Sequence, residues 1–459
     1  DNVNWTVEKL GGSNRFDLNP KDQLWIMQNG SWINPSGSNN AIYTGNVLYG
    51  WTATGWESAP GYNSTEGSTI YPGSECATTN VSGLTNYSKV KYTGNLDAAN
   101  KFEWIGRIKD TQNWTGWDTN SQFQSGGPNY RDGISIDVEE YNGVETKWTG
   151  NKSTDWCECL NWYNFRVPTE NSDVEIPQQN VSIRNLELSD QADPSAVICR
   201  NLIVKGNITN LTNASLKVKG NFTLEGGSIN FDSNTINLEI GGNVNIDNSG
   251  NFKVSEANIK LNGSENQNIN GNSEIVFGAL TIDKPSSDVI IGKDIAVNTL
   301  NLIKGKITTG DNRVYINNPA INAIITNVTN LSCINGNLRR AVAQTGSYTI
   351  PVGNASNLEL ATIVLNSSSG LTYLDIRFDD HITASMDISP LNLRVGGTLI
   401  QTLLDAGYWS ISPNPGLTEV NYDIKLDMRG ATNIGDNATQ HTVVKRDDSS
   451  SDWYLQGNH

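Results

Sequence analysis

The strongest constraint on the fold is a series of short apolar alternations within residues 181–318, each ending in Gly-Asn or Gly-Ser. The glycines of four such endings are Gly206, Gly220, Gly242 and Gly263, which lie 14, 22 and 21 residues apart. Repetition with a period of about 20 residues is typical of a solenoid, in which each repeat forms one coil that stacks on the next. The pattern predicts a parallel β-solenoid over residues 181–333.

The composition of these repeats suits stacked coils. Residues 216–219 and 259–262 alternate apolar and polar side chains, so that one side of each expected strand can face a core. Gly and Asn adopt positive φ at the least cost, which suits the corners between strands. The coils would stack strand on strand at a spacing of about 4.8 Å. A large antiparallel sandwich of hairpins is the alternative, because the 14-residue interval departs from the period.

The net charge of −16 over 459 residues disfavours several classes of partner. Binding of nucleic acid depends on clustered Lys and Arg, so a chain with a pI of about 4.7 would be repelled by that polyanion. The same charge disfavours an anionic membrane surface, and no apolar run approaches the roughly 18 residues of a membrane span. We therefore expect neither nucleic acid as a partner nor a membrane-spanning segment.

Tryptophan is distributed unevenly, which predicts separate domains with different cores. Eleven of the 13 tryptophans lie at or before Trp162, and the next one is Trp409. Short apolar runs separated by Gly, Pro and Asn turns predict antiparallel strands before the repeats, and longer alternating runs predict them afterwards. We expect four parts: an antiparallel β-sandwich or jelly roll with Trp-rich loops at 1–147, a Trp-rich cap and linker at 148–180, the parallel β-helix at 181–333 and a C-terminal β-sandwich at 334–459.

The part at 148–180 lies where a solenoid needs a cap. The end of a solenoid leaves strand edges unpaired and a core open to water, so a folded chain must cover it. Trp148, Trp156 and Trp162 lie just before the repeats and are large enough to plug that core. We therefore expect these three rings to be buried together.

Two ordered sets of residues carry a resemblance to known proteins. The first set is Trp148-Thr149-Gly150, Ser153-Thr154-Asp155-Trp156, Asn161-Trp162, Val167-Pro168 and Asp173-Val174-Glu175-Ile176-Pro177, and the second is Gly336-Asn337-Leu338-Arg339-Arg340 with Gly346–Gly353. They resemble modules of large, repeat-rich surface proteins of Bacteroidetes-type bacteria, which leave the cell by type IX secretion. The resemblance covers residues 148–459, and Cys157-Glu158-Cys159 interrupts its first set. It implies a secreted, adhesin-like architecture and carries over no catalytic residue.

Aromatic loops of the first part are candidate ligand-binding sites. Trp51 and Trp56 lie in a loop rich in Gly and Ser, and Trp114 and Trp117 lie in the run Asn-Trp-Thr-Gly-Trp. Sugar rings present apolar faces that stack on exposed indoles, while Asn, Asp and Gln bind the hydroxyls. The alternative is that these tryptophans fill a core, because large aromatic residues are more often buried anchors than exposed platforms.

An acidic run at residues 132–140 is a weak candidate for calcium binding. Calcium prefers several carboxylate and carbonyl oxygens in a flexible loop, and Asp132 and Asp137 could supply two of them. The spacing matches no known calcium loop, so the alternative is a solvated face of a strand. No other cofactor is predicted.

The five cysteines are Cys76, Cys157, Cys159, Cys199 and Cys333. The absence of a CxxC motif disfavours a structural zinc site, and an acidic, polar chain favours disulfides in an extracellular protein. Cys199 and Cys333 would lie about six coils apart, far beyond the roughly 7 Å limit for a disulfide. We therefore predict that Cys76 and Cys199 each pair with one of Cys157 and Cys159, which leaves Cys333 free.

No catalytic residue is predicted. Some β-solenoids are polysaccharide lyases or hydrolases, and glycoside hydrolysis needs paired carboxyl groups at a set separation. The acids of the solenoid show no evident alignment on successive coils: they are Glu225, Glu239, Asp247, Glu256 and Glu265. His381 follows two aspartates without a nucleophile motif, which indicates a solvated turn.

These observations predict an all-β protein at the extracellular cell surface, with a right-handed parallel β-helix flanked by antiparallel β-sandwich domains. The predicted function is that of a non-enzymatic adhesin or structural module that displays a glycan-binding N-terminal domain. Two alternatives remain open: a polysaccharide-active β-helix enzyme, and an assembly component that docks other chains through its sheet edges. The expected partners are a glycan or protein ligand and other surface or secretion-system proteins.

Overall fold

The computed structural model describes most of the chain. The described residues are 23–28, 31–33, 42–44, 46–52, 78–80, 84, 87, 89–125, 136–137, 146–150, 153–163, 166–178, 186–188, 197–210, 215–231, 237–247, 253–328, 332–380, 392–435 and 440–459. They fall into two compact units. Unit 1 comprises residues 1–143 and 163–166, and unit 2 comprises residues 144–162 and 167–459.

The described strands of unit 1 form several small sheets. Its described elements are β1 (Gln23–Gln28), β2 (Trp32–Ile33), β3 (Ile42–Tyr43), β4 (Asn46–Thr52), β5 (Thr78–Asn80), β6 (Lys89–Tyr92), β7 (Ala99–Asn100), α1 (Lys101–Lys109), η3 (Thr111–Asn113), β8 (Trp114–Trp117), α2 (Asn120–Ser125) and β9 (Ile136–Asp137). Antiparallel pairs join β1 to β4, β2 to β3 and β6 to β8, whereas β4 and β5, and β7 and β9, pair in parallel. The predicted antiparallel sandwich of this part is therefore not confirmed.

Helix α1 differs from the strands that we expected in this part. Trp104 and Ile108 lie four residues apart, the spacing of one helical face, and Trp104 is buried. Arg107 and Lys109 lie in the last turn, where cations interact favourably with the helix dipole. Neither described helix has the length and apolar character needed to cross a bilayer.

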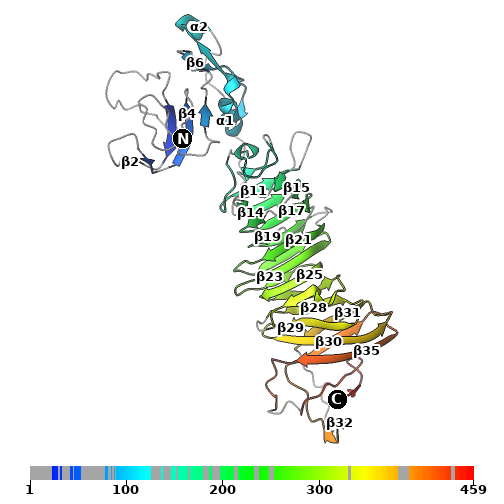
Figure 1. Cartoon of the computed structure of the whole chain (residues 1–459). Coiled ribbons are helices and arrows are strands. Elements are labelled where there is room, and N and C mark those ends of the chain that lie inside the picture. The colour runs from blue at the N-terminus through cyan, green and yellow to red at the C-terminus, as the bar shows by residue number, and fades with distance from the viewer. Residues whose placement is uncertain are drawn as a thin grey trace. The chain divides into compact units, whose positions relative to one another are not determined.

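Unit 2 contains a parallel β-solenoid of about six turns (Figure 1). One ladder of parallel strands runs through β11 (Asp173–Ile176), β14 (Asn201–Val204), β17 (Phe222–Glu225), β20 (Val244–Asp247), β22 (Gln267–Gly271), β24 (Val289–Ile291) and β26 (Ile307–Ile316). A second runs through β13 (Ile198–Cys199), β16 (Ser215–Val218), β19 (Asn237–Ile240), β21 (Lys253–Leu261), β23 (Ile275–Asp283), β25 (Ile295–Lys304) and β27 (Ile324–Thr326). A third begins with β12 (Leu186–Leu188), β15 (Asn207–Asn210) and β18 (Ser228–Phe231). The predicted solenoid is confirmed, because these ladders are parallel where hairpins would be antiparallel.

Apolar side chains repeat once per coil and stack on one another. In the first ladder, Leu202 is in register with Phe222, Phe222 with Val244 and Val244 with Ile269. The steps between these partners are 20, 22 and 25 residues, and all four side chains are buried in one continuous core. Alternate positions along each strand therefore build the core, as the apolar periodicity predicts.

The interval of 14 residues between Gly206 and Gly220 has a simple geometric origin. The N–H of Ser228 donates to the carbonyl of Gly206, so the Gly206 corner stacks below Gly227, 21 residues later. A different corner holds Gly220, whose carbonyl accepts a hydrogen bond of 2.7 Å from the N–H of Gly242. Each corner thus repeats at about one coil length, and the interval of 14 residues measures the distance between two corners of the same coil.

A ladder of four asparagines runs along one corner of the solenoid. The amide oxygen of Asn201 accepts from the backbone N–H of Asn221 at 2.7 Å, and Asn221 accepts in the same way from Asn243 at 2.9 Å. The ladder continues from Asn243 to the N–H of Asn268 at 2.8 Å. At its other end Asn201 donates to Asp173 at 2.7 Å. Side-chain amides therefore satisfy corner N–H groups that would otherwise lack partners.

The three tryptophans of the predicted cap are buried together at the start of the solenoid. β10 (Thr146–Lys147) pairs in parallel with β11, and Trp148 follows it. The Trp162 ring meets those of Trp148 and Trp156 edge to face, with centroids 5.1 and 4.8 Å away. The Trp162 indole N–H donates to the Trp156 carbonyl at 2.7 Å. These rings belong to the same core as Leu202, as expected of a plug.

The last solenoid coil continues into antiparallel strands. These are β28 (Ile334–Ala341), β29 (Gly346–Gly353), β30 (Leu358–Ser369), β31 (Tyr373–Asp379), β34 (Tyr408–Pro413) and β35 (Glu419–Asp427). β28 pairs in parallel with β26 and antiparallel with β31, which pairs antiparallel with β34. A second layer is formed by β29, β30 and β35, again antiparallel. The predicted separate C-terminal sandwich is not confirmed, because these strands extend the solenoid within one compact unit.

The cysteine pairing predicted for Cys199 is wrong. Cys199 lies on β13, where its side chain faces the core of the first coils, and it is a free thiol. Burial there raises its pKa and removes the thiol from any partner at the surface. Cys333 is free, as predicted, and burial raises its pKa to about 12. No disulfide joins two described cysteines, and Cys76 lies outside the described residues.

A lysine is buried at one corner of the solenoid. The Nζ of Lys284 donates to the carbonyls of Gly263 and Glu265 at 2.9 and 2.8 Å and to Gln267 Oε1 at 2.7 Å. Gln267 in turn donates to the carbonyl of Ile240, so the cation links successive coils. Because its side chain is only 1% exposed, burial lowers the pKa of Lys284 to about 8.

The depressed pKa of Lys284 predicts a stabilising contribution to unit 2 as the pH rises from about 8 to about 10.4, the ordinary pKa of lysine. Over that range this lysine is protonated in the unfolded chain but not in the folded chain, so it adds up to about 1.4 kcal/mol per pH unit to the free energy of unfolding. The buried thiols of Cys199 and Cys333 act in the opposite direction, because their raised pKa keeps protons on the folded chain that the unfolded chain loses. Urea titrations of the protein and of Lys284→Met at pH 8, 9 and 10 therefore give the contribution of Lys284 as the difference between the two slopes, and equal slopes would rule it out.

Candidate functional site

Trp114, predicted to be a ligand platform, packs within unit 1. Its ring lies 5.7 Å from that of Tyr92, edge to face, and 6.1 Å from that of Trp51. Its indole N–H donates to the carbonyl of Ile108 at 2.8 Å. These contacts place Trp114 beside the small core around Trp104. The ring therefore stabilises the unit, and a role in glycan binding stays a prediction.

The other predicted binding residues are only partly described. Trp117 is half-buried at the end of β8, in register with Lys89. Trp56 and Asp132 lie outside the described residues. Asp137 lies on β9, opposite Asn100. Within the described part of the chain, no three His, Cys, Asp or Glu residues are grouped closely enough to hold a metal ion.

The structure brings two solenoid acids into register that seemed unaligned in the sequence. Glu225 on β17 lies opposite Asp247 on β20, on the adjacent coil, and both are exposed. Lys205 lies 3.8 Å from Glu225, and Asn245 donates to Asp247 at 2.5 Å. The two acids are 22 residues apart, which is one coil step. Their alignment is visible in the sequence only when this step is applied to polar as well as apolar positions.

The remaining acids do not form such a pair in the described residues. Glu239 lies in register between Lys217 and Lys260. Glu265 uses its carbonyl to accept from Lys284. The side chain of Glu256 and the whole of His381 lie outside what the structure describes, and the nearby Asp379 forms an ion pair of 2.9 Å with Arg377.

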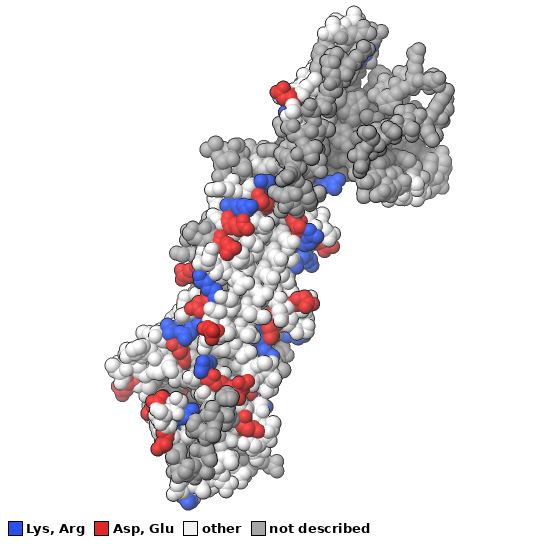
Figure 2. All heavy atoms as spheres, turned by 180° about the vertical axis from the view of Figure 1, so that it is seen from behind, with Lys and Arg blue, Asp and Glu red and all other residues white. Residues whose placement is uncertain are grey.

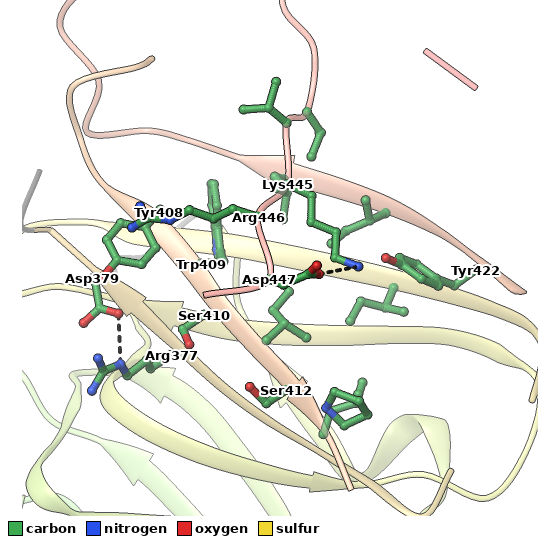
Figure 3. A pocket seen from close by; sticks show the side chains of 18 of the residues that line it. Arg377, Asp379, Tyr408, Trp409, Ser410, Ser412, Tyr422, Lys445, Arg446 and Asp447 are labelled. Carbon is green, nitrogen blue, oxygen red and sulfur yellow. Dashed lines mark hydrogen bonds and ion pairs between the residues drawn. The ribbon is translucent and has the colours of Figure 1, made fainter. Parts of the chain in front are cut away.

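A hollow lies in the C-terminal part of unit 2. It has a volume of about 650 Å³ and is bounded by both antiparallel layers. Figure 3 shows Tyr408, Trp409, Ser410 and Ser412 along β34, with Tyr422 of β35 lining the same cavity. The apolar part of its wall includes Leu365, Leu374, Ile411, Val420, Ile424 and Leu426. The volume and lining are those of a site for a small, largely apolar ligand.

A short hairpin supplies polar groups to this cavity. Lys445 and Tyr454 exchange backbone hydrogen bonds of 2.9 and 2.8 Å, which brings the neighbouring Arg446 and Trp453 together. The Asp448 carboxylate accepts from the Ser450 N–H and hydroxyl at 2.8 and 2.6 Å, and these bonds lower the pKa of Asp448 to about 2. The turn is thus held by a charged group that stays ionised at neutral pH.

The cations around the cavity differ in their partners. Arg377 pairs with Asp379 at 2.9 Å, and Lys445 lies 3.9 Å from Asp447 (Figure 3). The Arg446 guanidinium instead lies over two rings, 4.7 Å from the centroid of Trp453 and 6.0 Å from that of Tyr408. Sequence analysis did not identify this site, because an isolated Arg in a polar segment carries no signal of its own.

Comparison with known proteins adds no assignment: no family model, curated protein or solved structure matches this chain. The resemblance of residues 148–459 to surface proteins of Bacteroidetes-type bacteria therefore stays a prediction.

Proposed function

We propose that the chain is a non-enzymatic structural module of an extracellular, adhesin-like bacterial surface protein. Its solenoid serves as a stiff spacer, and unit 1 provides recognition of a glycan or protein ligand. The single observation that carries the proposal is the unbroken series of parallel pairings from β11 to β28. Backbone hydrogen bonds between coils run along such a solenoid and resist its bending or stretching. We also propose that the solenoid is right-handed, as about 98% of parallel crossovers are.

The outer surface of the solenoid supports a spacer rather than a charged binding face. Lys217, Glu239 and Lys260 lie in register on successive coils, so opposite charges alternate along the ladder. Figure 2 shows basic and acidic side chains interspersed over the described part of one face. No large field of one sign is present there to attract a polyanion.

The extracellular and adhesin parts of the proposal rest on the sequence. They are supported by the two motif sets that begin at Trp148 and Gly336, and by the acidic, Asn-rich composition. Other surface or secretion-system proteins are the partners that this resemblance implies. The N-terminal unit has several half-buried aromatic side chains, including Trp51 and Trp117, which suit a glycan or protein ligand.

The proposal is tested by incubating the purified chain with a panel of soluble and insoluble polysaccharides. Depletion of the protein from solution and release of new sugar ends are followed together. Retention without release of ends would support glycan recognition by unit 1, and neither retention nor release would favour a spacer whose ligand is a protein. Release of ends that scales with the protein concentration would contradict the non-enzymatic assignment.

A second candidate function is hydrolysis or cleavage of a polysaccharide, favoured by the register of Glu225 and Asp247. Adjacent coils place such residues about 4.8 Å apart along the ladder, and glycosidases use paired carboxyl groups at about 5–9.5 Å. The double variant Glu225→Gln and Asp247→Asn distinguishes the two candidates in the same assay. Any release of ends that persists in this variant would exclude the pair as its origin.

A further inference from the structure

The cavity of unit 2 has an apolar body and a cation, Arg446, that forms no ion pair within the described part of the chain. Its apolar wall, described above, would exclude water from the chain of a bound ligand. Among the described residues, no carboxylate lies within ion-pair distance of Arg446, whereas Arg377 and Lys445 each have one. The described hydrogen bond of Arg446 is a long one, 3.4 Å to the carbonyl of Ser449. Its guanidinium therefore retains donors for an anion.

A second donor lies close to Arg446. Among the described residues, the buried indole N–H of Trp453 has no acceptor. A buried N–H without an acceptor is costly, so an acceptor supplied by a ligand would stabilise it. The Arg446 guanidinium lies over the face of the Trp453 ring, and both residues line the cavity.

We propose that this cavity binds an amphipathic carboxylate of the fatty-acid class. The hydrocarbon chain packs against Leu365, Ile411 and Ile424, and the carboxylate accepts hydrogen bonds from Arg446 and from the indole N–H of Trp453. A guanidinium suits this role because its planar donors match the two oxygens of a carboxylate. This ligand would add a lipid-like partner to the proposed spacer, and the inference does not depend on that function.

The test uses the full chain and two probes of equal chain length, dodecanoate and 1-dodecanol, below their aggregation limits. Isothermal titration calorimetry measures the affinity for each. Because a charge-assisted hydrogen bond discriminates by at least about tenfold, dodecanoate should bind about tenfold more tightly than the alcohol. Saturable binding of dodecanoate with this preference is the expected result, and its absence in the folded chain would overturn the proposal.

Two variants assign the headgroup. Arg446→Gln should weaken dodecanoate binding about tenfold and leave 1-dodecanol binding unchanged. Trp453→Phe keeps the ring against Arg446 and removes the N–H, so it should weaken dodecanoate binding several-fold. Equal losses for acid and alcohol in both variants would show a merely structural role and overturn the assignment. Circular dichroism confirms that each variant is folded.

A third pair of variants locates the hydrocarbon chain. Ile424→Trp fills the cavity from β35 and should abolish binding of both probes. Lys425→Trp is the matched control, because its side chain is exposed, does not line the cavity and lies on the next position of the same strand. Undiminished binding in Ile424→Trp would place any bound ligand elsewhere and overturn the proposal.

Discussion

Trp162→Ala is expected to lower the free energy of unfolding of unit 2 by about 3–5 kcal/mol, the usual range for deleting a large buried ring. The Trp162 side chain is fully buried and contacts two other indoles, so its removal leaves a cavity between them. The unpaired carbonyl of Trp156 adds to this cost. Urea unfolding followed by circular dichroism measures the difference from the unchanged protein.

Trp162→Phe is the control that separates packing from hydrogen bonding. It keeps an aromatic ring between Trp148 and Trp156 but removes the 2.7 Å hydrogen bond, so the loss should fall to about 1–3 kcal/mol. If both variants unfold at the urea concentration of the unchanged protein, the three rings do not cap the solenoid core.

Phe277→Ala should destabilise the middle of the solenoid by a similar amount, about 3–5 kcal/mol. Phe277 is fully buried on β23, in register with Val254 on one coil and Val297 on the other. Removing the ring therefore opens a void between two stacked coils. Urea unfolding followed by circular dichroism again gives the change.

Ile325→Ala is the matched control for that change. Ile325 lies in the same solenoid but on its outer surface, in register with Asn301, and is 53% exposed. Its truncation should cost no more than about 0.5 kcal/mol, as is usual for surface substitutions. Comparable losses in the free energy of unfolding for Phe277→Ala and Ile325→Ala would contradict the assignment of Phe277 to the core and Ile325 to the outer surface.

The solenoid can be predicted from sequence because one physical requirement recurs in every coil. Inward positions must be apolar and corners must accept close backbone approach, as at Gly242, where an added Cβ would lie 2.4 Å from the Gly220 carbonyl carbon. The sequence does not predict which corner of the coil each glycine occupies. Gly206 belongs to a second corner, and this alone produces the interval that had favoured a sandwich.

Side-chain direction limits the prediction of cysteine pairing. Cys199 and Cys333 are both free thiols, as the coil spacing predicts from their separation along the solenoid. The coil spacing does not specify which face of β13 the Cys199 side chain occupies. Strand alternation places the Cys199 side chain in the core, where it is a free thiol.

The candidate ligand site could not be predicted, because its parts are distant in sequence. Its walls come from β30, β34 and β35, and its polar end comes from a hairpin that includes Arg446 and Trp453. The volume depends on the separation of two layers, which no local pattern specifies. The one local signal is the apolar alternation of β35 at Val420, Tyr422 and Ile424, which indicates a buried face but not a hollow beside it.

The most direct test of the stiff solenoid is the distance between spin labels placed on its outer ladder. Lys217, Glu239, Lys260, Thr281, Asn301 and Ile325 follow one another in register, one per coil. Labels introduced as a non-natural amino acid at 217 and 301, and at 217 and 325, span four and five coil steps. Pulsed electron–electron double resonance should give narrow distributions of the distance between labels, centred at about 19 and 24 Å. The mean distance should rise by about 4.8 Å for each added coil. Broad distributions, or means that do not rise with the number of coils, would contradict the stacked spacer.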